Sequence, residues 1–90
     1  MQITDEHKKI LEYMDEEWGY RYHFLEKETG IKKSRIKQIM LDLKLAGYCE
    51  WQPFMDEEGT NGSGHLLTGK GVALKNELGI EKKDNDYDYD

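Results

Sequence analysis

The chain is short of several features on which common classes of protein depend. Its 90 residues include one cysteine and one proline, and no run of about 18 apolar residues is present. A single thiol, Cys49, can form neither an internal disulfide nor a Cys-x-x-Cys pair, so we interpret it as a small buried hydrophobic residue. No charged segment followed by an apolar one has the character of a secretion leader. We therefore expect a soluble, cytoplasmic protein that does not span a membrane.

Residues arranged for catalysis or metal binding are also scarce. The three histidines lie far apart and lack a His-x-x-x-His spacing, which argues against a metal site. Ser34 has no nearby histidine pattern, and no glycine-rich phosphate loop follows a predicted strand. Residues 84–90 alternate Asp with other residues as a calcium loop does, but they lack its glycine and its glutamate. We expect no enzymatic activity, no metal and no cofactor.

Acidic residues dominate what is present. Nineteen Asp and Glu residues against thirteen Lys and Arg residues give a formal net charge of -6. This charge argues against wholesale coating of nucleic acid, but a local basic face still acts within a Debye length of roughly 8–10 Å. Residues 30–51 form such a local exception, with five basic and two acidic residues. Residues 81–90 are acidic and without a core-forming pattern, so we predict a disordered tail after a single domain of residues 1–80.

Apolar periodicity and turn residues predict an α+β, mainly helical fold. Thr4 suits the start of the first helix and Thr68 that of the last, while Gly30, Gly47 and Gly79 suit helix ends. The expected elements are a helix at about 4–17, a short strand or turn at 18–22, a helix at about 23–29, a helix at about 33–46, strands at 48–55 and 65–67 around a polar turn at 56–64, and a helix at about 69–78.

Both tryptophans and one of the two phenylalanines lie outside the predicted helices. Trp18, Trp51 and Phe54 are interpreted as side chains that seal a thin core, and an exposed patch for a partner is the alternative. Pro53 cannot donate to a strand ladder, so the strand that contains it is expected at a sheet edge.

The helix at 33–46 has the strongest pattern. Its predicted buried stripe consists of Ile36, Ile39, Met40 and Leu43. No small polar cap precedes it, and Lys32 and Lys33 place two cations at the positive end of the helix dipole. Such a placement is unfavourable by up to roughly 1 kcal/mol, and a bound phosphate would explain it.

Two stretches carry a resemblance to a known family. The first reads FLEKETGIKKSRI, residues 24–36, and continues to Gly47; the second reads LLTGKG, residues 66–71. The first resembles the helix-turn-helix of small bacterial and archaeal regulators, and the second resembles the segment that follows the wing in MarR-like and PadR-like regulators. The chain is thus similar to a winged helix-turn-helix domain, which has a three-helix core, a β-hairpin wing and a C-terminal helix. The acidic residues 56–58 would keep this wing tip away from phosphate.

The resemblance implies a sequence-specific double-stranded DNA-binding protein, a transcriptional regulator, with the helix at 33–46 in the major groove. Arg35 and Gln38 are then expected to read bases, because Arg pairs with guanine and Gln with adenine. Positioning on the DNA is expected from Lys32, Lys33, Ser34, Lys37, Arg21 and Tyr22. For Arg21 and Tyr22, the alternative is a surface arginine and a core aromatic residue without a role in binding.

A second interpretation stays open. The acidic wing, first helix and tail also fit a winged-helix protein–protein interaction module, or an acidic inhibitor that mimics nucleic acid. DNA binding requires the face around Lys33 to stay positive, whereas the rival requires a larger continuous negative face. Related regulators usually form dimers, often through longer terminal helices than this chain offers, so a homodimer also stays open.

Overall fold

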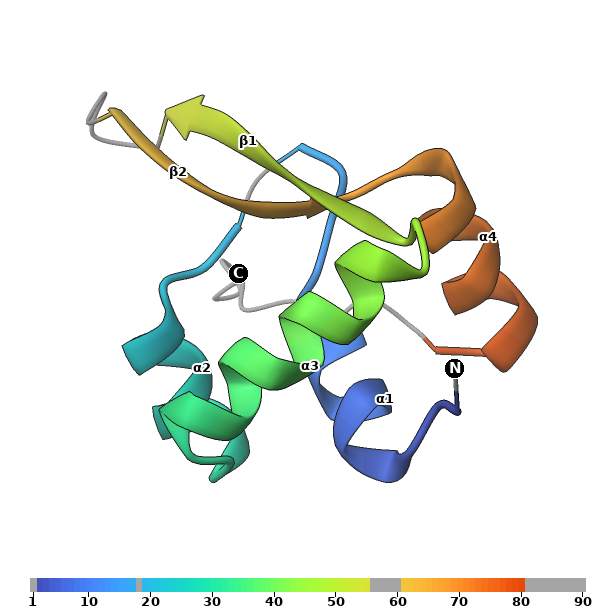
Figure 1. The fold of residues 1–90 in the computed structure, drawn as a ribbon, viewed down its shortest axis with the longest axis horizontal. Helices are drawn as coiled ribbons and strands as arrows, with labels where there is room; N and C mark the ends of the chain where they lie inside the picture. Colours follow the sequence, from blue (N-terminus) through green and yellow to red (C-terminus); the bar gives the residue numbers. More distant parts are fainter. Residues whose placement is uncertain (1, 18, 56–60, 81–90) are drawn as a thin grey trace, which may run out of the picture.

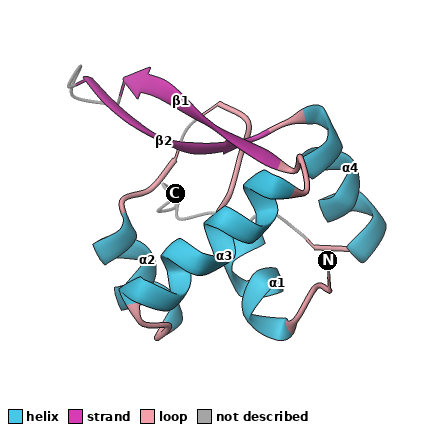
Figure 2. Ribbon diagram, in the orientation of Figure 1, coloured by secondary structure: helices cyan, strands magenta, loops and turns pink. Residues whose placement is uncertain are grey.

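The computed structural model describes residues 2–17, 19–55 and 61–80, which form four helices and one antiparallel hairpin (Figure 1, Figure 2). In chain order the elements are α1 (Asp5–Leu11), α2 (Tyr22–Thr29), α3 (Lys33–Leu45), β1 (Cys49–Met55), β2 (Asn61–Leu67) and α4 (Gly69–Leu78). The fold is therefore α+β and mainly helical, as the sequence predicts. Among these residues, no helix has both the length and the apolar character needed to cross a membrane.

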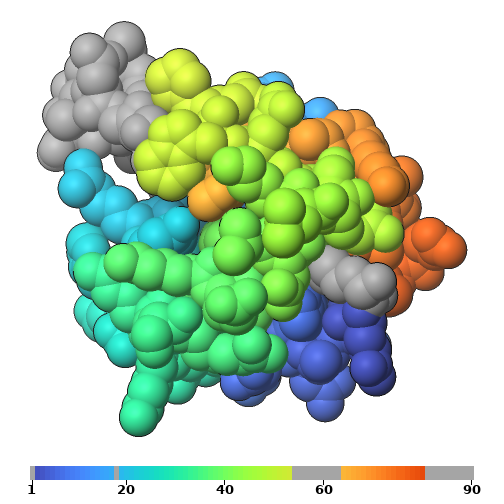
Figure 3. Space-filling model, in the orientation of Figure 1, coloured from blue at the N-terminus to red at the C-terminus, as the bar shows by residue number. Residues whose placement is uncertain are grey.

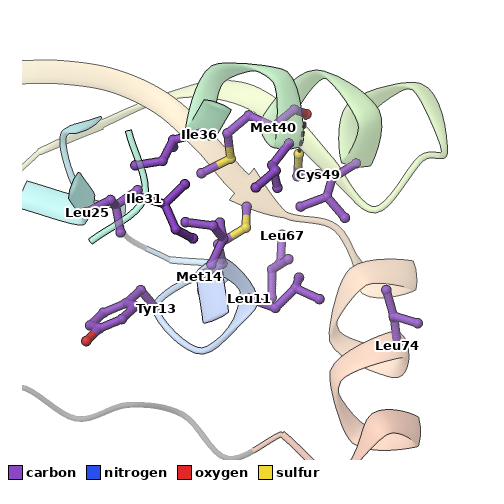
Figure 4. Close-up of a cluster of buried hydrophobic side chains, with 13 residues drawn as sticks. Leu11, Tyr13, Met14, Leu25, Ile31, Ile36, Met40, Cys49, Leu67 and Leu74 are labelled. Carbon is purple, nitrogen blue, oxygen red and sulfur yellow. Dashed lines mark hydrogen bonds between the residues drawn. The ribbon is translucent and has the colours of Figure 1, made fainter. Parts of the chain in front are cut away.

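Helix α3 lies in the middle of the molecule and contacts α1, α2 and β1 (Figure 1). Its predicted stripe of apolar residues is buried, and Ile36, Ile39 and Leu43 have no exposed surface. The core between the helices and the root of the hairpin also contains Cys49, whose thiol lies 3.7 Å from the Met40 carbonyl oxygen (Figure 4). The prediction of a small buried cysteine is confirmed.

The predicted helix ends are confirmed where the chain supplies caps. The Thr4 hydroxyl oxygen accepts the His7 amide of α1, and the Thr68 hydroxyl oxygen accepts the Gly71 amide of α4. The residues that follow α2, α3 and α4 include glycines in the left-handed region, with φ of 76° at Gly30, 86° at Gly47 and 70° at Gly79.

Helix α1 is shorter than predicted. It ends at Leu11, whereas the sequence pattern predicts a helix to about residue 17. Two carbonyl groups beyond its end accept hydrogen bonds from distant partners. The Leu67 amide donates to the Asp15 carbonyl oxygen at 2.8 Å, and the Lys75 ammonium donates to that of Met14 at 3.0 Å. The chain itself turns more tightly at this point, because the Tyr13 and Met14 amides donate to the carbonyl oxygens three residues before them.

An aromatic cluster occupies the connection between α1 and α2, where a short strand or turn was predicted. Tyr20 stacks on Phe24 with ring centroids 4.7 Å apart, and Tyr13 meets both rings edge-on. The helix begins at Tyr22, and residues 19–21 form no strand. Trp18 lies outside the described residues.

The return strand of the hairpin is longer than predicted. Cys49 lies opposite Leu67, Trp51 opposite His65, and Pro53 opposite Ser63. Residues 61–64, predicted as part of the turn, belong to β2, because backbone pairing can continue through polar and glycine residues once the register is set. Both strands of a two-stranded sheet are edges, which accommodates the proline as expected. The acidic residues 56–58 and the tail 81–90 lie outside the described residues.

Candidate nucleic-acid interface

On the side of α3 that faces α1, the polar side chains are already paired with carboxylates. The Arg35 Nε donates to Glu6 Oε1 at 2.8 Å. The Gln38 Nε2 donates to Asp42 Oδ1 at 3.2 Å, and the other oxygen of Asp42 lies 3.5 Å from Nε2 of the buried His7. Arg35 and Gln38 are the residues predicted to read bases. For either side chain to reach a base, its present contact must first break.

On the side of α3 that faces the hairpin, three lysines follow one stripe of the helix. Lys33, Lys37 and Lys44 are all exposed and lie within about a sixth of a turn of one another at helical spacing. The Lys37 ammonium stands 5.9 Å from the centre of the Tyr22 ring. Within the described ranges, none of the three lysines forms an ion pair. This side therefore carries the uncompensated positive charge of α3.

The N-terminus of α3 receives an anion from within the protein. Lys32 is the N-cap residue and makes no side-chain capping bond, as predicted. Instead, Oε2 of Glu26, on α2, accepts the Lys33 amide at 3.1 Å. A carboxylate at this end of a helix is favourable for the same reason that a phosphate would be. The arrangement of Lys32 and Lys33 therefore does not require a bound phosphate to explain it.

A hollow of about 280 Å³ lies between the start of α2, α3 and the hairpin. Figure 3 shows the surface indented between the start of α2 (light blue) and β1 (yellow). Aromatic side chains contribute much of its lining, namely Tyr13, Tyr20, Tyr22 and Trp51. Its described lining also includes Arg21 and Lys33 and contains no acidic residue. The lining is therefore positively charged, although the whole chain has a formal net charge of -6.

The hairpin supplies the outer wall of this groove. Side chains alternate between the two faces of a strand, so Trp51 shares a face with Cys49, and His65 with Leu67. Cys49 and Leu67 are buried in the core, whereas Trp51 lies beyond it and is 53% exposed. The Trp51 and His65 rings meet edge-on at 5.0 Å. The interpretation of Trp51 as a core-sealing residue is wrong, because the core ends at the Cys49–Leu67 pair, two pairs nearer to the hairpin root.

Burial keeps the titratable groups at the back of the groove neutral. It lowers the pKa of His65, helped by the charge of Lys44, and it raises the pKa of Tyr22, helped by Cys49. The Tyr22 hydroxyl lies 3.3 Å from Nδ1 of His65, a position from which it can donate to the neutral imidazole. The positive charge of the lining therefore comes from Arg21 and Lys33.

The structure divides the predicted site residues into three groups. Arg21, Tyr22, Lys33 and Lys37 lie on or beside the groove, while Arg35 and Gln38 lie on the α1 side. Lys32 and Ser34 are exposed at the N-terminal end of α3 between them. Sequence reasoning missed Trp51 and His65 as groove residues. For Trp51 and His65, the signal was their alternation with the apolar Cys49 and Leu67 along paired strands.

Comparisons with protein-family models, with curated proteins and with solved structures found no match. In the described part of the chain, no group of His, Cys, Asp or Glu side chains is arranged to hold a metal ion. The chemistry of the site is therefore that of its lysines, its arginine and its aromatic rings.

Proposed function

We propose that the chain is a winged helix-turn-helix domain that binds double-stranded DNA as a transcriptional regulator. The order of three helices, a hairpin and a last helix supports the domain type, together with the Thr-Gly joint between α2 and α3. The observation that carries DNA binding is the stripe of Lys33, Lys37 and Lys44, which is free of ion pairs within residues 2–17, 19–55 and 61–80. Phosphate contacts supply most of the affinity of such proteins.

The pairing of Arg35 changes the expected roles along α3. Lys33 and Lys37 contact phosphates without breaking an ion pair of the described residues, and Arg21 joins them from the start of α2. Gln38 and Ser34 are exposed at the N-terminal half of α3, the part that meets base edges in related domains. Arg35 reads a base only after its guanidinium leaves Glu6, and Gln38 only after its amide leaves Asp42. Phosphate binding is therefore assigned to the hairpin side of α3, and base reading to the N-terminal half of its outer face.

A salt titration of binding to duplex DNA tests this assignment with matched variants of one helix. Lys37→Ala and Arg35→Ala each remove one positive charge from α3. The Lys37→Ala change should reduce the slope of log affinity against log salt by about 0.9, the value for one phosphate contact. The Arg35→Ala change should reduce it less, because Glu6 already offsets that charge. Glu6→Gln should tighten binding, since it releases the Arg35 charge without changing the size of the side chain at position 6.

Two outcomes would contradict the proposal. One is equal loss of slope in Lys37→Ala and Arg35→Ala, which would remove the distinction between the two sides of α3. The other is the absence of duplex binding near about 50 mM salt, where phosphate contacts are strong.

The outer face of α3 favours a second candidate function. Leu41 is 45% exposed and Leu45 is 77% exposed, one helical turn apart. Large apolar side chains gathered on an exposed helix face are a feature of protein interfaces. A winged-helix interaction module, or a homodimer formed through α3, would use this pair. Leu45→Lys should then abolish self-association measured by light scattering and leave the phosphate contacts of Lys37 intact, whereas an unchanged molar mass would count against this candidate.

A further inference from the structure

We propose that the groove between α2, α3 and the hairpin binds one unpaired nucleotide, with its base against Trp51 and its phosphate beside Arg21 and Lys33. The inference deepens the proposed function because it uses the charge of the same side of α3. It names a different ligand, however, which is single-stranded nucleic acid.

The groove has the size of a small ligand site. Its volume of about 280 Å³ is just under the roughly 300 Å³ at which sites for drug-sized ligands begin. It is open on one side, between the start of α2 and β1 (Figure 3). A nucleotide can therefore enter it while the rest of a strand remains outside.

The aromatic lining supplies a surface for stacking. Trp51 is 53% exposed, and its perpendicular contact with His65 leaves much of the indole uncovered. Tyr20 and Tyr22 are also part of the lining, and the Tyr22 hydroxyl reaches His65 of β2 at the back of the groove. Bases of any sequence stack on such rings, and this is how many proteins hold single strands. The exposed indole is thus suited to the face of a base.

The charges of the lining select an anion. Arg21 and Lys33 are cationic, and the described lining holds no carboxylate. Lys37 adds a third cation above the Tyr22 ring. A nucleotide joins a flat apolar ring to a negative phosphate, and the groove presents the complement of both parts. An apolar side chain of a protein partner would use Trp51 and leave the cations without a role.

The ligand is unpaired because stacking on Trp51 requires an exposed base face. Both faces of a base within a duplex are covered by its neighbours, and removing it from the stack costs a few kcal/mol. A base that is already single-stranded avoids this cost. The groove therefore distinguishes single strands from intact duplex, while the lysines of α3 attract both.

Anisotropy of a fluorescein-labelled thymidine hexamer, with the full chain at low salt, tests the inference. Trp51→Ala should weaken binding by about 5- to 150-fold, the range found when a stacking aromatic residue is removed. Trp51→Phe keeps an aromatic face and should bind within about threefold of the parent. Asn76→Ala, on α4, is the control, because it truncates an exposed, uncharged side chain that is absent from the groove lining, and its affinity should be unchanged.

Two further measurements keep the test independent of folding defects. In a Trp18→Phe background, Trp51 is the only tryptophan, and its emission should fall when the hexamer binds. Arg21→Ala changes an exposed side chain and should reduce the salt slope for the hexamer by about 0.7, the single-strand value for one contact. Circular dichroism of each variant confirms that it is folded.

The outcomes separate this inference from the proposed function. Duplex binding without hexamer binding would overturn the inference alone, whereas hexamer binding without duplex binding would support it and overturn the regulator proposal. Equal affinities of Trp51→Ala and Asn76→Ala for the hexamer would overturn it. Quenching of Trp51 by an uncharged tyrosine-containing peptide, but not by the hexamer, would assign the groove to a protein partner and also overturn it.

Discussion

Replacing Gly71 with alanine tests how closely α4 is joined to the root of the hairpin. Gly71 lies in the first turn of α4 and is buried. A Cβ atom at this position would collide with the Tyr48 carbonyl oxygen and would lie 2.9 Å from Cδ2 of Leu67. The collision involves backbone, so a change of side-chain rotamer cannot relieve it. The same carbonyl oxygen accepts the Thr68 amide at 3.0 Å, so a shift of the backbone also strains that hydrogen bond.

The size of the effect follows from these two contacts. Overpacking typically costs about 1–3 kcal/mol, and a weakened hydrogen bond costs about 1 kcal/mol. Each kcal/mol lowers the Tm of a domain of this size by about 4–8 °C. Gly71→Ala is therefore expected to lower the free energy of unfolding by about 2–4 kcal/mol and the Tm by roughly 10–30 °C.

Gly69→Ala provides a control in the same helix. Gly69 is exposed, and an added Cβ would meet nothing within 4 Å. Alanine restricts the unfolded chain more than glycine, so this variant should be neutral or more stable by up to about 1 kcal/mol. Thermal melts followed by circular dichroism compare the two. Equal Tm values for the two variants would refute the close approach of α4 to Tyr48.

Three further predictions concern single side chains. Burial raises the pKa of Cys49 to about 11, so thiol reagents should label it slowly in the native protein and rapidly in urea; fast native labelling would place it at the surface. Burial lowers the pKa of His65 below its ordinary value of 6.5, and the folded state then binds fewer protons than the unfolded state. Stability should be full above 6.5 and fall as the pH drops below it, and urea titrations should show a weaker fall in His65→Gln. Glu26→Ala removes the acceptor for the Lys33 amide and should cost about 0.5–2 kcal/mol in urea unfolding, whereas unchanged stability would show that water replaces it.

The helical pattern of the sequence predicted α3 well because its signal is local. Ile36, Ile39 and Leu43 recur at the spacing that brings them to one face, and each is fully buried. The end of α1 was not predictable in this way. The Met14 and Asp15 carbonyl groups just beyond it bond to residues of α4 and β2, and a one-dimensional pattern carries no record of such partners.

In the candidate site, too, some features were predicted by the local sequence and others depend on how the helices and the hairpin pack. The cations before and within α3 were recognised from composition, and Lys33 and Lys37 are exposed as predicted. The contact of Arg35 with Glu6 joins residues from α3 and α1 that are 29 positions apart. Its existence depends on how the helices pack, so the sequence alone gave no reason to remove Arg35 from the base-reading set. The exposed position of Trp51 likewise depends on where the core ends along the hairpin.

The carboxylate of Glu26 occupies the N-terminus of α3, the position that a bound phosphate would take. A phosphate that arrives beside the Lys33 amide would replace a resident anion, and the released carboxylate would gather cations of its own from solution. The net release of ions from such a contact is smaller than for a lysine in open solvent. The slope of log affinity against log salt would therefore not report a phosphate contact at this position. In Glu26→Gln, which has no carboxylate to displace, the same contact would add to the slope.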